Sequence, residues 1–236
     1  MAQRFDADKL QVTGEAFPVV EHLRGPAQFS VSENGVLVYI TGNPERNQLT
    51  WFNRSGNPVD TLAPPGGFVV PGLSPDEKRV TVVRVDHPPT TDIWLIDQRG
   101  VATAITSNTA YYSVPVWSPD GTRIAFASNR EGVFNLYQKL SSGAGNEEEL
   151  LKSNENKDAS DWSPDGRFIL YGTQREASLL PKLWVLPLFG DRKPYSLNAT
   201  CSKVGGENTF SPNGRWVAYV SNETGRCRCR MPWLTC

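Results

Sequence analysis

The sequence predicts an all-β fold: a β-propeller of four-stranded antiparallel blades, in which about five blades are recognisable and the last is incomplete. Three observations predict it. One motif recurs five times at a nearly constant spacing, apolar and polar residues alternate after each copy, and 20 glycines and 18 prolines accompany seven tryptophans and seven tyrosines. This balance is typical of short aromatic strands joined by tight turns.

The recurring motif defines the repeat. Its clear copies read WSPDGTRIAFASN, WSPDGRFILYGTQ and FSPNGRWVAYVSN, and its weaker copies read LSPDEKRVTVVRV and FSVSENGVLVYIT. The copies begin at Ser30, Ser74, Ser118, Ser163 and Ser211, so the steps between them are 44, 44, 45 and 48 residues. A period of about 40 to 50 residues with strand-like content indicates one propeller blade per repeat.

Each copy opens with a turn. In Ser-Pro-Asp-Gly the proline presets φ, the aspartate suits the third position, and the glycine accepts the left-handed conformation. The second copy has Glu77 in place of that glycine, which we expect to cost about 1 kcal/mol if the conformation is kept. We interpret the acids of these turns as turn formers and not as calcium ligands. The structural turn residues are Pro75, Asp76, Pro119, Asp120, Gly121, Pro164, Asp165, Gly166, Pro212, Asn213 and Gly214.

The strands that follow the turns have two apolar faces. In TRIAFAS, Ile124 and Phe126 share one face, and in RFILYGT, Phe168 and Leu170 lie opposite Ile169. Two apolar faces are expected of a blade that is packed between two neighbours. Third strands with an aromatic centre follow in LTWFN, DIWLID, FNLYQK and KLWVLP, and fourth, outer strands are predicted in ATAIT, EELLK and KPYSL.

Composition argues against several partners. The 24 basic and 25 acidic residues leave no basic excess, so we expect no nucleic-acid binding. No run of about 20 apolar residues occurs, and MAQRFDADKL lacks the apolar core of a signal peptide. We therefore expect a soluble chain without membrane insertion or a signal peptide.

The cysteines do not predict a metal site. All four lie near the end of the sequence, at Cys201, Cys227, Cys229 and Cys236. The spacing of Cys227 and Cys229 is not that of a zinc knuckle, and neither histidine, His22 or His87, is near. We expect no metal and no cofactor.

The W/F-S-P-D/N-G turn, followed by an alternating strand and an aromatic strand, resembles the WD40-like (PD40) repeat of TolB-type propellers over residues 25–226. The lead-in, residues 1–24, resembles the segment before such propellers in large bacterial proteins, which often place them behind a membrane span and a serine/threonine kinase domain. The resemblance implies the sensor-like part of a longer, extracytoplasmic or periplasmic protein. No kinase motif is present in this sequence.

Ring closure is left open by the sequence. The resemblance implies six or more blades and another aromatic third strand after Arg226, where the sequence instead reads CRCRMPWLTC. We interpret residues 227–236 as an atypical tail of a truncated propeller. The segment Phe17 to Leu23 could supply an outer strand to the last blade, and a closed five-blade ring, an open ring and a ring completed by another chain remain alternatives. An open last blade would favour self-association.

The predicted function is a non-catalytic binding or sensor scaffold that recognises a protein or small ligand, of unknown identity, through one face and the channel mouth. An enzyme is the less favoured class, because no G-x-S-x-G motif occurs and few bases are present. Two alternatives stay open: a hydrolase of a glycoside, ester or peptide that uses channel-mouth carboxylates, and an inactive fragment of a larger propeller protein. The candidate ligand-binding residues, each at or just before an inner strand, are Gln28, Tyr111, Tyr112, Asp158, Asp161, Glu207 and Asn208.

Overall fold

The computed structural model describes eleven segments of the chain: residues 2–6, 11–17, 29–31, 37–43, 46–53, 57–85, 90–107, 110–174, 182–200, 208–219 and 229–230. These segments form 21 strands in six antiparallel sheets and contain no helix. Accordingly, the described residues hold no helix that could span a membrane. The all-β prediction is confirmed.

Five of the sheets are blades, and each follows the repeat predicted from the sequence. Blade 1 consists of β3 (Phe29–Val31), β4 (Leu37–Asn43), β5 (Arg46–Phe52) and β6 (Pro58–Thr61). Blade 2 consists of β7 (Phe68–Leu73), β8 (Arg79–Arg84), β9 (Asp92–Asp97) and β10 (Ala102–Ala104). Blade 3 consists of β11 (Tyr112–Trp117), β12 (Arg123–Glu131), β13 (Val133–Leu140) and β14 (Glu148–Leu151). Blade 4 consists of β15 (Asn156–Trp162), β16 (Phe168–Gln174), β17 (Lys182–Pro187) and β18 (Tyr195–Thr200).

Blade 5 has three strands, β19 (Thr209–Phe210), β20 (Trp216–Ala218) and β21 (Cys229–Arg230). Beyond residue 226, where the sequence analysis ended the propeller, Val217 pairs with Cys229 and Trp216 with Arg230. A pairing of two residues uses backbone groups alone, so it does not need the aromatic centre by which the other third strands were predicted.

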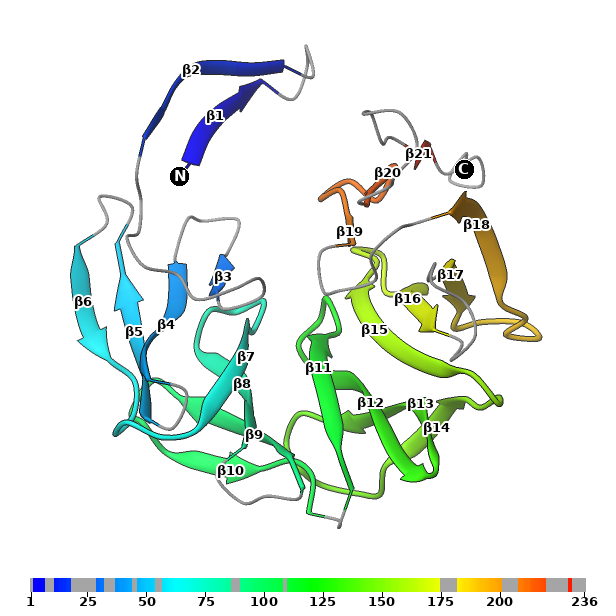
Figure 1. Cartoon of the computed structure of the whole chain (residues 1–236), viewed down its shortest axis with the longest axis horizontal. Helices are drawn as coiled ribbons and strands as arrows, with labels where there is room; N and C mark the ends of the chain where they lie inside the picture. The colour runs from blue at the N-terminus through cyan, green and yellow to red at the C-terminus, as the bar shows by residue number, and fades with distance from the viewer. Residues whose placement is uncertain are drawn as a thin grey trace.

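The blades follow one another along an arc, with the first strand of each blade nearest the axis (Figure 1). Consecutive inner strands contact one another: β3 contacts β7, β7 contacts β11, β11 contacts β15, and β15 contacts β19. A separate hairpin of β1 (Ala2–Asp6) and β2 (Gln11–Phe17) lies at the opening of the arc, between blades 1 and 5. Phe17 ends β2, and residues 18–23 lie outside the described part of the chain, so a closing strand there stays a prediction.

The Ser-Pro-Asp-Gly turns repeat one hydrogen-bond pattern. In blade 3, the Ser118 hydroxyl donates to Asp120 Oδ1 (2.6 Å) and accepts from the Arg123 amide (2.9 Å), and Asp120 Oδ1 accepts from the Thr122 amide (3.0 Å). Blades 2, 4 and 5 repeat this pattern from Ser74, Ser163 and Ser211, with an asparagine as acceptor in blade 5. We call the end of the propeller that carries these turns the turn face, and the opposite end, where each inner strand begins, the start face.

The fourth residue of the turn has a left-handed backbone conformation in blades 2 to 5. Gly121, Gly166 and Gly214 have φ values of 69°, 74° and 67°, and Glu77 adopts 60° in the same place. Glu77 thus occupies the conformation that glycine takes in the other blades, at the cost expected of a residue with a Cβ atom.

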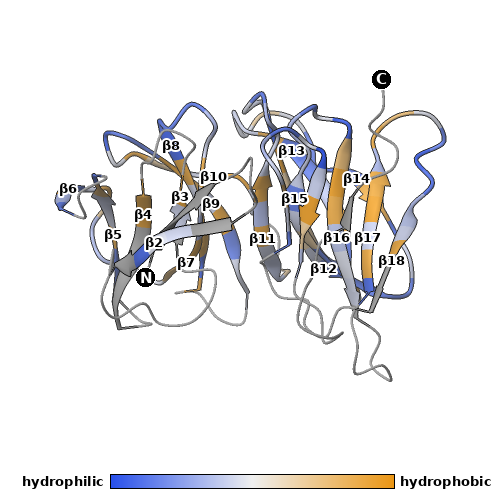
Figure 2. Cartoon of the chain, turned by 90° about the horizontal axis from the view of Figure 1, so that it is seen from above, coloured by the Kyte–Doolittle hydropathy of each residue, from blue (hydrophilic) through white to orange (hydrophobic). Residues whose placement is uncertain are grey.

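Apolar clusters fill the four junctions between blades, as the two-faced strands predict. Ile124 and Phe126 pack toward blade 2, Ile169 packs toward blade 3, and Phe168 and Leu170 pack toward blade 5. A fourth cluster joins blades 1 and 2. The strands are accordingly the hydrophobic part of the molecule, and polar residues gather in the turns along the upper end of the view in Figure 2.

A β-bulge recurs in the inner strands of blades 2, 3 and 4. In β15 the register shifts between Ala159 and Asp161, and equivalent shifts occur in β7 and β11. In a regular strand, two residues separated by an odd number of positions face opposite sides. The extra residue of a bulge between them puts them on the same side. Ala159 and Trp162 therefore both pack into the core shared with blade 3.

Candidate functional site

Asp158 joins blades 3 and 4 at the channel wall. Its Oδ1 accepts a hydrogen bond from the Ser113 hydroxyl at 2.8 Å. Ser113 precedes Asp158 by 45 residues, the step between these two repeats, so the two side chains occupy the same position in adjacent inner strands. Burial raises the pKa of Asp158 to about 6, despite the hydrogen bond from Ser113, which favours the charged form.

Asp161 joins blades 4 and 5. Its Oδ2 accepts from the Phe210 amide (2.6 Å) and the Thr209 hydroxyl (2.8 Å), and its Oδ1 accepts from the Trp162 amide (2.8 Å). Burial raises the pKa of Asp161, and these hydrogen bonds oppose the rise. Because both carboxylate oxygens already have donors, this residue holds β19 against β15.

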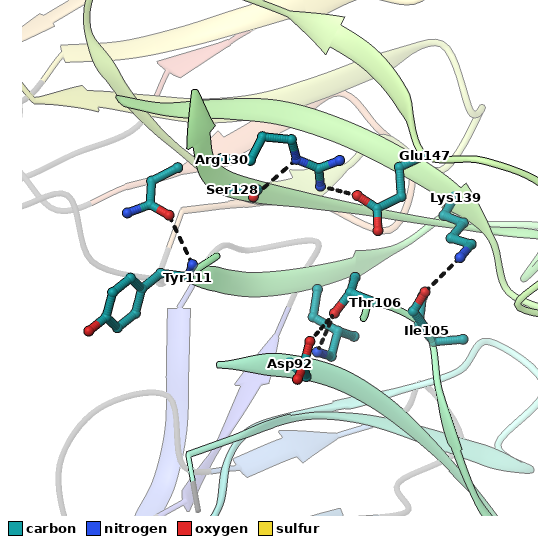
Figure 3. Close-up of polar contacts among 10 residues, drawn as sticks. Asp92, Ile105, Thr106, Tyr111, Ser128, Arg130, Lys139 and Glu147 are labelled. Atoms are coloured by element: carbon teal, nitrogen blue, oxygen red, sulfur yellow. Dashed lines mark hydrogen bonds and ion pairs between the residues drawn. The ribbon is translucent and has the colours of Figure 1, made fainter. Parts of the chain in front are cut away.

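Of the other candidate residues, those that the structure describes make separate contacts. Asn208 is buried, and its Nδ2 lies 3.5 Å from the Ser160 hydroxyl, to which it donates. Tyr111 is 45% exposed, and its amide donates to Asn129 Oδ1 at 2.9 Å (Figure 3). Gln28 and Glu207 lie outside the described residues, as do both histidines.

Tyr112 is a correction to the sequence prediction. We expected it beside Tyr111 at the channel mouth, but it is only 2% exposed and packs edge to face on Phe126, with ring centroids 5.7 Å apart. Strand alternation explains the difference, because consecutive residues point to opposite sides. Tyr112 therefore belongs to the core between blades 2 and 3.

A cationic corner of blade 3 is built around Arg130, which lies over the rings of Tyr112 and Tyr137. The guanidinium of Arg130 lies 4.1 Å from the ring centroid of Tyr137, donates to the Ser128 hydroxyl at 3.3 Å and forms an ion pair with Glu147 (Figure 3). Burial raises the pKa of Tyr137. The corner is a packed polar contact of blade 3, and its charges are already paired.

A groove of about 630 Å³ lies between blades 3 and 4 on the side of the start face. We call it the start-face groove. Its wall includes the stacked rings of Tyr171 and Trp184, whose centroids are 6.5 Å apart at an interplanar angle of 18°. Three cations line it, namely Lys157, Lys182 and Lys193, with Glu155 as the acidic side chain among the lining residues. The volume is typical of small-ligand sites.

Lys157 is the least expected member of this groove. Lysine side chains are rarely fully buried, but Lys157 is only 3% exposed. Its Nζ donates to Asn135 Oδ1 (2.9 Å) and to the Glu155 carbonyl (2.8 Å). Burial lowers its pKa to about 8, against the opposing effect of Glu155 and Glu149. The burial of Lys157 could have been predicted from the alternation of β15, which places Lys157 on the same side as the buried Ala159.

A second groove, of about 680 Å³, lies between the same blades on the turn face. Its carboxylates and Arg123 have partners within the protein, whereas Arg192 forms no ion pair with a described side chain. Glu148 Oε2 accepts from Arg123 (3.2 Å) and Gln138 (2.9 Å), and Asp120 is held in its own turn, where the hydrogen bond from Ser118 contributes most to lowering the pKa of Asp120. This groove offers less unsatisfied polarity to a ligand than the start-face groove does.

No group of three or more histidine, cysteine, aspartate or glutamate side chains within the described ranges could hold a metal ion. The cysteine side chains lie outside those ranges.

Comparison with known proteins gives a consistent result. A family model for the TolB β-propeller domain, PD40, matches residues 55–231. A curated relative, the uncharacterized protein Atu1656 of Agrobacterium fabrum (strain C58 / ATCC 33970), is 29% identical over 107 residues, which are 44% of this chain and 34% of that protein. The chain thus spans about a third of this relative.

Solved structures with the same architecture include two TolB proteins. TolB from Acinetobacter baumannii aligns with a TM-score of 0.68 and 21% identity, over 80% of this chain and 46% of that one. A putative TolB from Agrobacterium tumefaciens aligns with a TM-score of 0.65 and 22% identity, over 82% of this chain and 68% of that one. At these identities the likeness shows the fold.

Proposed function

The chain belongs to the PD40 family of TolB β-propeller domains, and we propose that it is a non-catalytic recognition scaffold that binds a protein or small ligand through its start face. The observation that carries the proposal is the start-face groove, which combines an aromatic wall with three lysines. The channel carboxylates, by contrast, are engaged in contacts between blades. The proposal includes an extracytoplasmic location for the longer protein that carries such a module.

The hydrolase alternative is less well supported. General acid or base catalysis needs a carboxyl group that can exchange a proton with the substrate. Asp161 accepts three hydrogen bonds and Asp158 binds a different neighbouring blade, so the two do not form a pair across one pocket. Under the proposal, variants of these residues change stability and remove no hydrolytic activity.

Thermal unfolding with added ligands tests the proposal. The panel consists of sugars, peptidoglycan fragments, peptides and divalent ions. A ligand at one hundred times its Kd adds about 2.7 kcal/mol, which is several degrees for a domain of this size. Asn154→Trp fills the start-face groove from an exposed loop, and Asn146→Trp is a matched control in an exposed loop that does not line it.

We expect the ligand-induced shift to vanish in Asn154→Trp and to persist in Asn146→Trp. A ligand-induced shift that persists in Asn154→Trp would show that the ligand binds outside this groove. Hydrolysis of a panel substrate that is lost on replacing Asp158 would favour the enzyme.

A further inference from the structure

The start-face groove contains a buried cation that forms no ion pair with a described carboxylate, although Glu155 and Glu149 lie near enough to favour its charge. Lys157 lines the groove and donates to two neutral oxygens, the side-chain carbonyl of Asn135 and the backbone carbonyl of Glu155. No described carboxylate forms an ion pair with it. An ammonium group has three N–H donors, so one donor of Lys157 has no acceptor there. A buried charge is unfavourable unless it is paired.

A second buried donor lies beside it. Asn135 is only 1% exposed, and its Nδ2 has no hydrogen-bond partner within the described part of the chain. Its Oδ1 is already used, because it accepts from both Lys157 Nζ and the Ser153 amide (3.1 Å). Two donors that lack acceptors therefore belong to neighbouring side chains: Lys157, which lines the groove, and Asn135, which lies behind it in contact with Lys157.

Two further lysines line the groove, together with one acid, Glu155. Lys182 and Lys193 are exposed and form no ion pair with a described side chain. Trp184 is only partly buried, although Tyr171 stacks on it and its Nε1 donates to the Thr173 hydroxyl at 3.2 Å. The groove thus offers cations that attract an anion and an aromatic surface beside them.

We infer that this groove takes a small carboxylate ligand, whose carboxylate binds Lys157 and whose ring or aliphatic part lies against Trp184. The inference rests on the proposed function and adds the chemical class of the ligand. A carboxylate supplies acceptor oxygens and the missing negative charge in one group. A neutral ligand of the same shape would leave the charge of Lys157 uncompensated.

A matched pair of probes tests the inference. Phenylacetate and phenylacetamide share the ring and differ in charge. We expect phenylacetate to bind with a Kd in the millimolar range and phenylacetamide to bind at least tenfold more weakly, as measured by calorimetric titration. Lys157→Met keeps the length of the side chain and should weaken phenylacetate binding at least tenfold. Lys152→Met is the control, because Lys152 is exposed and does not line the groove.

A second variant keeps the inference testable if Lys157→Met does not fold. Lys182→Met combined with Lys193→Met changes only exposed rim residues, and should weaken phenylacetate binding by a smaller factor than Lys157→Met. Equal binding of the two probes, or phenylacetate binding that Lys157→Met leaves intact, would overturn the inference. If both probes bind equally and Asn154→Trp abolishes both, the groove still binds ligands and only the carboxylate class is wrong. If neither probe binds, the inference fails, and the ligand panel decides the proposed function separately.

Discussion

At the junction between blades 2 and 3, Arg79 and Trp117 reach across to the neighbouring blade, whereas their counterparts between blades 3 and 4 bond within their own blade. Trp117 Nε1 donates to the Gly72 carbonyl (3.0 Å), and Arg79 donates to the Gly121 carbonyl (3.2 Å). The counterpart of Trp117 is Trp162, which donates to Gly166 in its own turn (3.1 Å). The counterpart of Arg79 is Arg123, which pairs with Glu148 of its own blade.

A single position in the repeat explains much of this difference. Gly72 lies two residues before Ser74, and the corresponding residue of blade 3 is Val116. A Cβ atom at Gly72 would lie 2.7 Å from Thr81 Oγ1 and 3.8 Å from the Trp117 ring. Val116 fills this space in blade 3, so the next tryptophan does not make the equivalent bond. Both grooves lie between blades 3 and 4, the junction that lacks an equivalent of the bond from Trp117 to Gly72.

The largest effect is expected for Trp117→Ala. Trp117 is 9% exposed and both packs in the core and bonds across the junction, so we expect a loss of about 3 to 5 kcal/mol in the free energy of unfolding. Urea denaturation measures it. Trp117→Phe keeps most of the packing and should lose only about 1 kcal/mol, the value of one hydrogen bond. Similar losses in both variants would mean that the crossing bond, and not the packing, dominates this junction.

Asp158→Asn tests the polar contact between blades 3 and 4. The folded-state pKa of Asp158, about 6, lies above its ordinary 3.8, so the folded state binds the proton more tightly. The resulting stability is complete below pH about 4 and is lost as the pH rises to about 6. The amide accepts from Ser113 without charge, so the variant should be more stable at pH 7.5 by up to about 3 kcal/mol.

The measurement is the melting temperature between pH 4 and pH 7.5. The stabilisation should disappear at the acid end. Asp60→Asn, at an exposed carboxylate of β6, should change little at any pH, and an equal response of both variants would refute the assignment to Asp158.

Gly72→Ala should make the junction between blades 2 and 3 resemble the one between blades 3 and 4, in which the tryptophan does not bond to the preceding blade. The new methyl group would lie 2.7 Å from Thr81 Oγ1, and overpacking of this kind costs about 1 to 3 kcal/mol. We expect the melting temperature to fall and tryptophan fluorescence to report a changed environment of Trp117. An unchanged melting temperature would show that Gly72 is not required for the close approach.

Glu148→Gln should have the smallest effect. The pair of Arg123 and Glu148 is partly solvated, with side-chain exposures of 34% and 58%, and such pairs contribute about 0.2 to 1 kcal/mol. The loss should diminish in high salt. A larger, salt-independent loss would mean that Glu148 acts mainly through its hydrogen bond from Gln138.

The blades could be predicted from sequence because their causes are local and repeated. The Ser-Pro-Asp-Gly turns and the alternation after them depend on residues within a few positions of one another. The turn bond of Asp120 and the burial of Phe126 therefore follow from the local sequence. The site was not predictable in this way. Lys157 meets Asn135, 22 residues away, and Asp161 meets Phe210, 49 residues away.

Contacts between blades depend on which side of the strand faces the neighbour, and a one-residue bulge changes that side. This limits the sequence analysis at the inner strands, where most candidate residues lie. Tyr112 is a different case, because simple alternation, without a bulge, separates it from its exposed neighbour Tyr111.

The succession of inner strands, each in contact with the next, has a consequence for how the protein unfolds. A row of units that interact with their nearest neighbours behaves as a one-dimensional array, in which stability is a sum of unit and interface terms. Unfolding then spreads as a front from an edge blade and slows where an interface is strongest. The bonds of Trp117 and Arg79 make the junction between blades 2 and 3 such a place, and amide hydrogen exchange would reveal it as a step in protection.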